Sequence, residues 1–157
     1  MRTLGLDVSP LRIGWAVVTD DPGDTECGTI TFKKDQWVTP GDRAEAIEDL
    51  LVDQSIKGIG LEAVFVGPNK LGSIRAAMAL GQVESICDYL WPDARQKVLT
   101  ASQWRSICGI EQGGKEPVMR WSTDHCANAD RPLPDSQDAA DAVAIAYAAN
   151  QWFADND

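Results

Sequence analysis

Two aspartates near the end of the chain stand in an unusually apolar setting. Asp138 and Asp141 belong to the stretch DAADAVAIA, in which the other residues are small or apolar. On a helix these carboxylates lie three residues apart on one face, and the alanines let that face press against a sheet. A carboxylate buried in such a helix is costly unless it is paired or binds a metal ion. Helix capping explains Asp138 equally well, but Asp141 lies a turn further in.

Two more carboxylates interrupt or end expected strands. Asp7 lies within an apolar first strand, where acids are rare, and Glu62 follows the apolar run 59–61. Each has an alternative interpretation, because Asp7 can end its strand at the Ser9-Pro10 turn and Glu62 can be a solvated strand end. All four acids converge if the strand ending in Glu62 pairs in parallel beside the first strand and the last helix covers both.

Four carboxylates at one site point to metal chemistry. Their mutual repulsion would protonate some of them unless cations neutralise the charge. Mg²⁺ is the common cation that prefers oxygen ligands. Two such ions about 3.5–4 Å apart activate a water and stabilise the leaving oxygen of a phosphodiester. The pattern therefore predicts metal-dependent phosphodiester hydrolysis, which needs no Ser, His or Cys nucleophile.

The elements that must position these acids follow an α/β order. Hydrophobic patterns predict strands over residues 2–8, 13–18, 27–32, 58–62 and 97–99. They predict helices over residues 42–53, 70–90, 101–108, 116–126 and 136–152. We therefore expect a five-stranded mixed sheet, an antiparallel meander followed by parallel strands, with helices on both faces. In the first strand Leu4, Leu6 and Val8 share one face, and Gly5 and Asp7 share the other.

Length and composition fit a single globular domain over residues 1–157. The chain is 44% hydrophobic and 24% charged, which is typical of a folded protein rather than a disordered tail. No segment resembles a signal peptide or a membrane span. The four cysteines are dispersed and form no CxxC pair, which argues against a zinc site or a disulfide framework. We therefore expect a cytoplasmic protein without a membrane partner.

The net charge of −10 is unusual for a protein that binds DNA, because phosphate contacts normally need a basic footprint. The charge is uneven along the chain. Residues 67–120 contain seven Lys or Arg against five Asp or Glu, whereas the rest contains seven against nineteen. We expect phosphate contacts to come from the basic segment, and metal ions to offset some of the acidic charge elsewhere.

Several segments, in order along the chain, resemble motifs of the RuvC family of junction resolvases. They are LGLDVS at 4–9, GWAV at 14–17, LEAVF at 61–65 with Asn69 after it, Gly81-Gln82, and DAADAVAIA at 138–146. The resemblance implies the RNase H-like fold and cleavage of four-way (Holliday) junctions, leaving 5′-phosphate and 3′-hydroxyl ends. It also implies that the catalytic, metal-binding residues are Asp7, Glu62, Asp138 and Asp141. They would hold two Mg²⁺ ions per active site, with Mn²⁺ able to substitute.

The same resemblance implies residues for DNA binding and for dimerisation. Phe65 matches the family's aromatic residue near the crossover, where it can stack on an unpaired base, although a core phenylalanine is an equally good interpretation. Arg105 and Lys115 fall where similar proteins contact the DNA backbone, and Lys70 and Arg75 are further basic candidates. The family works as homodimers, and the helix over 70–90 would lie near the two-fold contact, unless its apolar stripe only faces the monomer core.

Other functions remain open on the sequence alone. A nuclease of the same fold can act on flaps, forks or RNA instead of intact junctions. A junction-binding protein without cleavage is another alternative, although such a protein has no reason to keep four clustered acids. An actin-like nucleotide-binding protein also has a Gly-x-Asp start, but it needs two such domains and 157 residues are too few.

Overall fold

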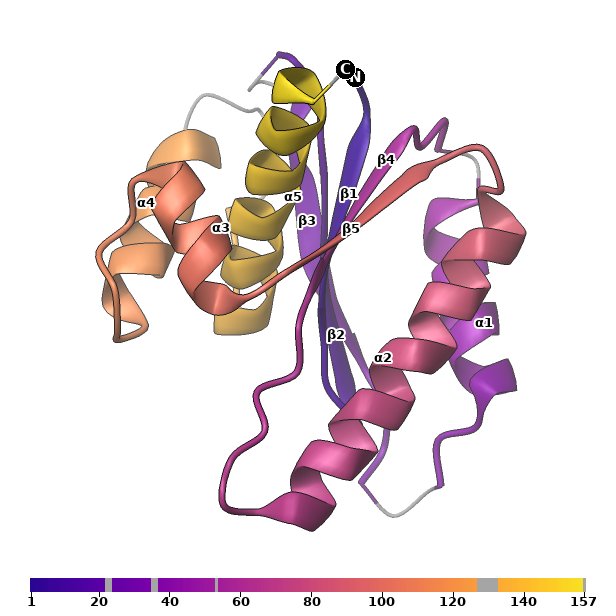
Figure 1. Ribbon diagram of the computed structural model, residues 1–157. Helices are drawn as coiled ribbons and strands as arrows, with labels where there is room; N and C mark the ends of the chain where they lie inside the picture. Colours follow the sequence, from indigo (N-terminus) through magenta and orange to yellow (C-terminus); the bar gives the residue numbers. More distant parts are fainter. Residues whose placement is uncertain (22–23, 35–36, 53, 127–132, 157) are drawn as a thin grey trace.

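One mixed sheet of five strands forms the centre of the molecule (Figure 1). The computed structural model describes residues 1–21, 24–34, 37–52, 54–126 and 133–156. The strand order is β3-β2-β1-β4-β5, so that β1 is central. The strands are β1 (Thr3–Val8), β2 (Arg12–Val18), β3 (Glu26–Thr31), β4 (Gly58–Glu62) and β5 (Arg95–Leu99). The pairs β1–β2 and β2–β3 are antiparallel, and the pairs β1–β4 and β4–β5 are parallel.

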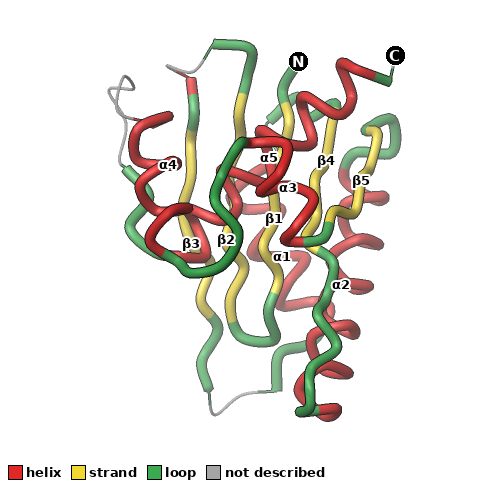
Figure 2. Tube along the Cα trace, turned by 60° about the vertical axis from the view of Figure 1, so that its left-hand side comes forward, coloured by secondary structure: helices red, strands yellow, loops and turns green. Residues whose placement is uncertain are grey.

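Helices cover both faces of this sheet. Two helices, α1 (Pro40–Leu51) and α2 (Lys70–Leu90), lie on one face. The other face is covered by α3 (Ala101–Cys108), α4 (Glu116–Cys126) and α5 (Gln137–Asp155). The two helical layers are separated by the sheet in both views (Figures 1 and 2). The predicted fold class, with its antiparallel meander and its parallel strands, is confirmed.

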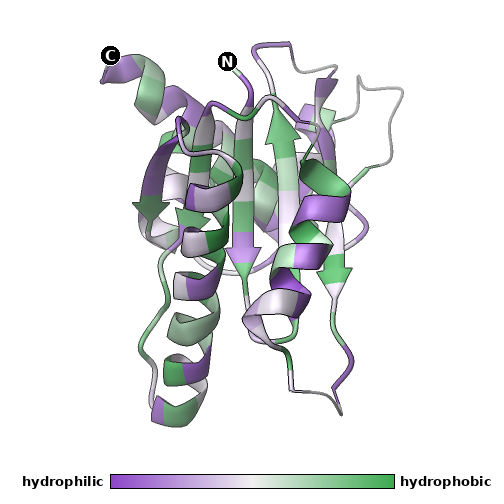
Figure 3. Cartoon of the chain, turned by 90° about the vertical axis from the view of Figure 1, so that its right-hand side faces the viewer, coloured by the Kyte–Doolittle hydropathy of each residue, from purple (hydrophilic) through white to green (hydrophobic). Residues whose placement is uncertain are grey.

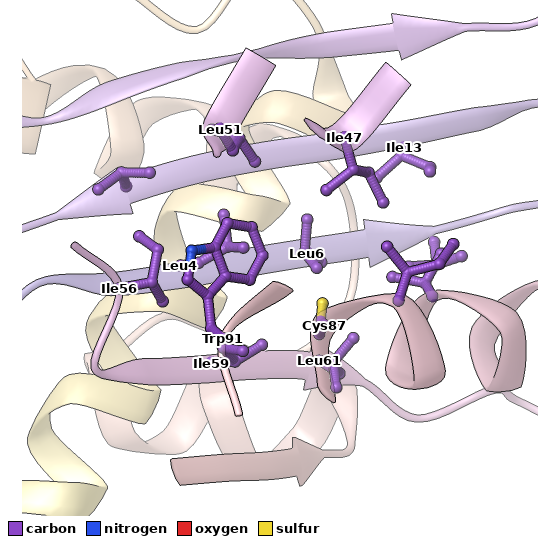
Figure 4. Close-up of a cluster of buried hydrophobic side chains, with 14 of the residues drawn as sticks. Leu4, Leu6, Ile13, Ile47, Leu51, Ile56, Ile59, Leu61, Cys87 and Trp91 are labelled. Carbon is purple, nitrogen blue, oxygen red and sulfur yellow. The ribbon is translucent and has the colours of Figure 1, made fainter. Parts of the chain in front are cut away.

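The alternation of side chains along β1 divides the core between the two layers. Leu4 and Leu6 are fully buried on the α1/α2 side, where Cys87 and Trp91 of the α2 end pack with them (Figure 4). Gly5 and Asp7 face α5 instead, as the period of two predicts. The buried residues of α5 are mostly alanines, which keeps that helix close to the sheet.

Some element boundaries differ from the prediction. Strand β5 begins at Arg95 instead of residue 97, because Arg95 continues the parallel ladder opposite Gly58 although its polar sequence gives no strand signal. Helix α1 begins at Pro40, where Thr39 forms a capping box with Asp42 and proline is favoured in the first turn. The predicted end of this helix, residue 53, lies outside the described residues. Within the described ranges, no helix is both long and apolar enough to span a membrane.

Candidate active site

The first two acids lie side by side at the carboxyl end of the central strands. Parallel pairing sets Leu6 opposite Leu61, so that the next residues, Asp7 and Glu62, follow on neighbouring strands. Both side chains are half-buried. Their proximity is also seen in their electrostatics, because the charge of Glu62 contributes to raising the pKa of Asp7. The predicted parallel pairing of these two strands therefore brings the two carboxylates together.

The third and fourth acids reach the same place because α5 packs directly on glycine. A Cβ atom at Gly5 would lie 2.2 Å from the carbonyl oxygen of Ala142, and one at Gly14 would lie 2.0 Å from that of Asp138. Only glycine allows such a close approach of helix to strand. Gly14 is also the partner of Asp7 across the β1–β2 ladder. Because Gly5 and Gly14 have no Cβ atom, the first turns of α5 can lie over Asp7.

Two of the acids are oriented by hydrogen bonds. The Nε2 amide of Gln137 donates to Oδ1 of Asp141 at 2.6 Å. The indole Nε1 of Trp104, a buried residue of α3, donates to Oε2 of Glu62 at 3.1 Å. Each bond leaves the second oxygen of its carboxylate available for another ligand.

Asp138 has a different environment, and it is not the helix cap. Ser136 is the N-cap residue of α5, and its side chain accepts a hydrogen bond from the Ala139 amide at 3.0 Å. Oδ2 of Asp138 lies 3.0 Å from Nε of Arg12 as an ion pair. That oxygen is buried and accepts no hydrogen bond from the described residues. A buried carboxylate oxygen with spare acceptor capacity is well suited to a cation ligand.

Burial and mutual repulsion raise the pKa values of three of the acids, Asp7, Glu62 and Asp141. Burial, followed by the charges of Glu62, Asp141 and Asp138, raises the pKa of Asp7 to about 8, with Arg12 opposing the shift. Burial is also the main reason why the pKa of Asp141 rises to about 6 and why that of Glu62 is raised. The site thus disfavours simultaneous ionisation of Asp7, Glu62 and Asp141, and a bound cation would favour the carboxylate form of each.

The acids converge, but their side chains are not arranged as a complete set of metal ligands. No three Asp, Glu, His or Cys side chains in the described ranges are grouped tightly enough to hold a metal ion. Three of the four carboxylates are turned towards partners of their own, which are Trp104, Arg12 and Gln137. The donors themselves are all oxygen atoms and fit Mg²⁺ or Mn²⁺. A metal ion bound by these acids would therefore require side-chain rotations that bring their oxygen atoms together.

Three of the predicted DNA contacts lie on the loop and helix that follow β4. Phe65 is 85% exposed in the loop before α2, so its alternative interpretation as a core residue is wrong. Lys70 is the first residue of α2, and Arg75 lies one turn later; both are exposed. A stacking role for Phe65 stays a prediction, as do phosphate contacts by the two basic residues.

The other two basic candidates lie on the α3/α4 side of the acids. The guanidinium of Arg105 donates to the carbonyl oxygens of Glu111 at 2.8 Å, Gly113 at 3.1 Å and Gly114 at 2.6 Å. It therefore holds the glycine-containing loop before α4. Lys115, at the end of that loop, is exposed. The charges of Arg105 and Lys115 both oppose the rise in the pKa of Asp141, so these cations are near the acids.

Three residues at the site were missed by the sequence analysis: Arg12, Trp104 and Gln137. Gln137 lies four residues before Asp141, and this helical spacing could have identified it. Arg12 and Trp104 carry no such signal, because they belong to β2 and α3 and meet the acids only through the fold.

Comparisons with known proteins agree on the fold. The chain matches none of the family models and none of the curated proteins with which it was compared. Two solved structures superpose on nearly the whole chain. A Thermus thermophilus RuvC structure has a TM-score of 0.73 at 17% identity, and the match covers 99% of this chain and 97% of that one. The T. thermophilus RuvC in complex with a Holliday junction substrate has a TM-score of 0.74 at 15% identity, over 99% and 96%. The protein therefore has the RuvC fold, a five-stranded mixed sheet of the RNase H-like type.

Proposed function

We propose that the protein is a metal-dependent endonuclease that resolves four-way DNA junctions. The observation that carries this proposal is the convergence of Asp7, Glu62, Asp138 and Asp141 at one end of β1 and β4 on the RuvC fold. The cluster is acidic and lacks a nucleophilic triad, which fits hydrolysis by activated water. That one similar structure holds a Holliday junction substrate supports the choice of branched DNA.

The four carboxylates are the proposed ligands for two Mg²⁺ ions per active site. The raised pKa of Asp7 and the buried Oδ2 of Asp138 both indicate that the cluster is incomplete without positive charge. When bound, the ions would supply Lewis-acid activation of water and of the scissile phosphate. Mn²⁺ should substitute, because it accepts the same oxygen ligands.

The remaining side chains position this acidic site. Trp104 holds one oxygen of Glu62, and Gln137 holds one oxygen of Asp141, so that each carboxylate keeps a defined orientation. Arg105 orders the loop that carries Lys115, which can then face the DNA backbone next to Asp141. Exposed Phe65 would stack on an unpaired base at the crossover.

Resolution of a junction requires two opposed cuts, and α2 is the proposed dimer contact. Its outer surface carries hydrophobic residues between hydrophilic ones (Figure 3). Four of them are more than half exposed: Leu71, Ile74, Met78 and Tyr89. Their exposure argues against the alternative in which the stripe only faces the monomer core. A two-fold contact through this helix would bury them and supply one active site for each strand.

A substrate panel tests the proposed function. Wild-type protein is incubated with a mobile four-way junction, a fork, a flap and a linear duplex, with Mg²⁺ or with EDTA. We expect paired, Mg²⁺-dependent cuts in the junction and their loss in Asp141→Asn, which keeps the shape but removes a metal-binding charge. Preferred cutting of flaps or forks would identify the alternative nuclease. Tight junction binding without any cleavage would identify a binding protein.

A further inference from the structure

A solvent-open groove of about 960 Å³ lies on the α1/α2 side of the sheet, at the same end as the acids. It forms where the β1–β2 turn, the end of β3 and the first halves of α1 and α2 meet, at the lower end of Figure 1. Its cationic lining residues are Arg12, Lys34, Arg43 and Arg75, and no described Asp or Glu lines it. In a chain with 24 acidic and 14 basic residues, this is a marked local excess of positive charge.

Arg43 lies in the wall of this basic groove without a direct ion pair among the described residues, although its guanidinium lies 5.3 Å from the centroid of the Phe32 ring and the charge of Asp42 acts on it. It is only 4% exposed. Nε donates to Oε1 of Gln82 at 3.0 Å and Nη2 donates to the carbonyl oxygen of Pro10 at 2.8 Å, so both acceptors are neutral. Nη1 is buried and finds no acceptor among the described residues, and no ion pair is formed there. Because an arginine stays protonated in proteins, an anion in the groove would offset the cost of burying this charge.

The rim of the groove combines exposed cations with an aromatic ring. Lys34 and Arg75 are exposed, and neither forms an ion pair within the described ranges. The Trp37 side chain is 76% exposed and also lines the groove. Cations beside an exposed aromatic ring suit a nucleotide, whose phosphate needs positive charge and whose base stacks on a flat surface.

The groove is connected to the acidic cluster by Arg12. This residue lines the groove, and its Nε lies 3.0 Å from Oδ2 of Asp138. A strand whose scissile phosphate lies at the acids can therefore continue past Arg12 around the β1–β2 turn. The positive charge along this path also explains how a protein with a negative net charge can bind DNA, because the local potential at the groove acts on the phosphates.

We propose that this basic groove binds an unpaired nucleotide of the DNA strand that enters the acidic site. Lys34 and Arg75 contact its phosphate, and Arg43 adds charge from the wall. Trp37 stacks on its base. The inference rests on the proposed nuclease function, but it concerns binding and can be tested without cleavage.

The test measures binding of a fluorescent oligothymidylate of eight nucleotides in EDTA, over a range of salt concentrations. The variants are Lys34→Gln, Arg75→Gln and Trp37→Ala, all at exposed positions where the fold tolerates change. Lys57→Gln is the matched control, because Lys57 is exposed at the opposite end of β4. We expect each charge variant to bind about ten-fold more weakly. The slope of log affinity against log salt concentration should become shallower by about 0.7, which corresponds to one lost phosphate contact on a single strand. Trp37→Ala should lower the affinity for the oligonucleotide roughly five-fold or more without changing its salt dependence. The control variant should bind like wild type.

Cross-linking identifies the contact directly. An oligonucleotide with 5-iodouracil, irradiated in the complex, should attach to the tryptic peptide 35–43, which contains Trp37. Wild-type affinity in all three groove variants, or cross-links confined to other peptides, would overturn the inference even if junction cleavage is confirmed. Thymidine 5′-monophosphate that binds as tightly as the oligonucleotide would show a pocket for free nucleotides and would also overturn it. The proposed nuclease function fails by a different result. In that case Mg²⁺ supports no cleavage, although the groove still binds the oligonucleotide.

Discussion

Replacing Asp7 by Asn should stabilise the metal-free protein at neutral pH. Asn has the shape of a protonated aspartic acid but cannot become charged. Burial and three neighbouring acids raise the pKa of Asp7 from its ordinary value of 3.8 to about 8. The folded state therefore binds this proton more tightly than the unfolded state does. Stability conferred by the protonated form is consequently lost as the pH rises from about 4 through 8.

The size of the effect follows from this shift. For each pH unit between the unfolded pKa of Asp7 and the working pH, the folded wild-type protein loses about 1.4 kcal/mol of stability. At pH 7 the upper bound on this loss is therefore about 4 kcal/mol. Rotation of the carboxylates away from each other relieves part of this cost, and we expect a net gain of about 2 kcal/mol. For a domain of this size that gain corresponds to a rise in Tm of roughly 4 to 8 °C.

The assay is thermal unfolding in EDTA at pH 4, 7 and 8.5. The advantage of Asp7→Asn should be near zero at pH 4 and should grow with pH. The control is Asp42→Asn, because hydrogen bonds from Thr39 lower the pKa of that carboxyl and its loss should reduce Tm at pH 7. Adding Mg²⁺ should raise the Tm of wild type but not that of Asp7→Asn. If Asp7→Asn were no more stable than wild type at pH 8.5, burial and the neighbouring acids would not raise the pKa of Asp7 as we infer.

Three further outcomes are expected. Asp141→Asn should reduce junction cleavage by at least about a thousand-fold while junction binding persists, as judged by single-turnover kinetics and gel shift, since the metal ions supply most of the acceleration; cleavage near the wild-type rate would exclude Asp141 from the site. Phe65→Ala should slow junction cleavage without changing the salt dependence of binding, and a reduced salt slope would contradict a stacking role. Gly14→Ala should destabilise the fold by about 1–3 kcal/mol in urea unfolding, because its Cβ would lie 2.0 Å from the Asp138 carbonyl oxygen, whereas Gly81→Ala, which meets nothing within 4 Å, should be neutral or stabilising.

The fold and the convergence of the four acids could be predicted because each left a local signal. Alternation along β1 separates Leu4 and Leu6 from Asp7, and the alanine-rich last helix shows that Asp141 sits in an apolar setting. Element types and order follow from such patterns. The strand predicted over 97–99 was too short. The first residues of β5, Arg95 and Gln96, are polar and belong to the strand only because they pair with β4.

The roles of Trp104, Arg43 and Arg105 could not be predicted, because they arise from tertiary contacts. Trp104 reaches Glu62 from α3, across 42 positions of sequence. Arg43 has the sequence of an ordinary exposed helix residue, yet it is buried and bonded to Pro10 and Gln82. Arg105 resembles a free surface cation, but its guanidinium is occupied by loop carbonyls. Neutralising it should therefore act on loop order more than on phosphate binding.

The most direct test of the proposed active site is the position of bound metal. A crystal of the protein soaked in Mn²⁺ gives anomalous difference peaks that locate the ions independently of the protein coordinates. We expect two peaks about 3.5–4 Å apart, bounded by the carboxylates of Asp7, Glu62, Asp138 and Asp141. Asp7→Asn should lose at least one of them. Full Mn²⁺ occupancy elsewhere, with no peak beside Asp7, would contradict the assignment of these four acids as the metal site.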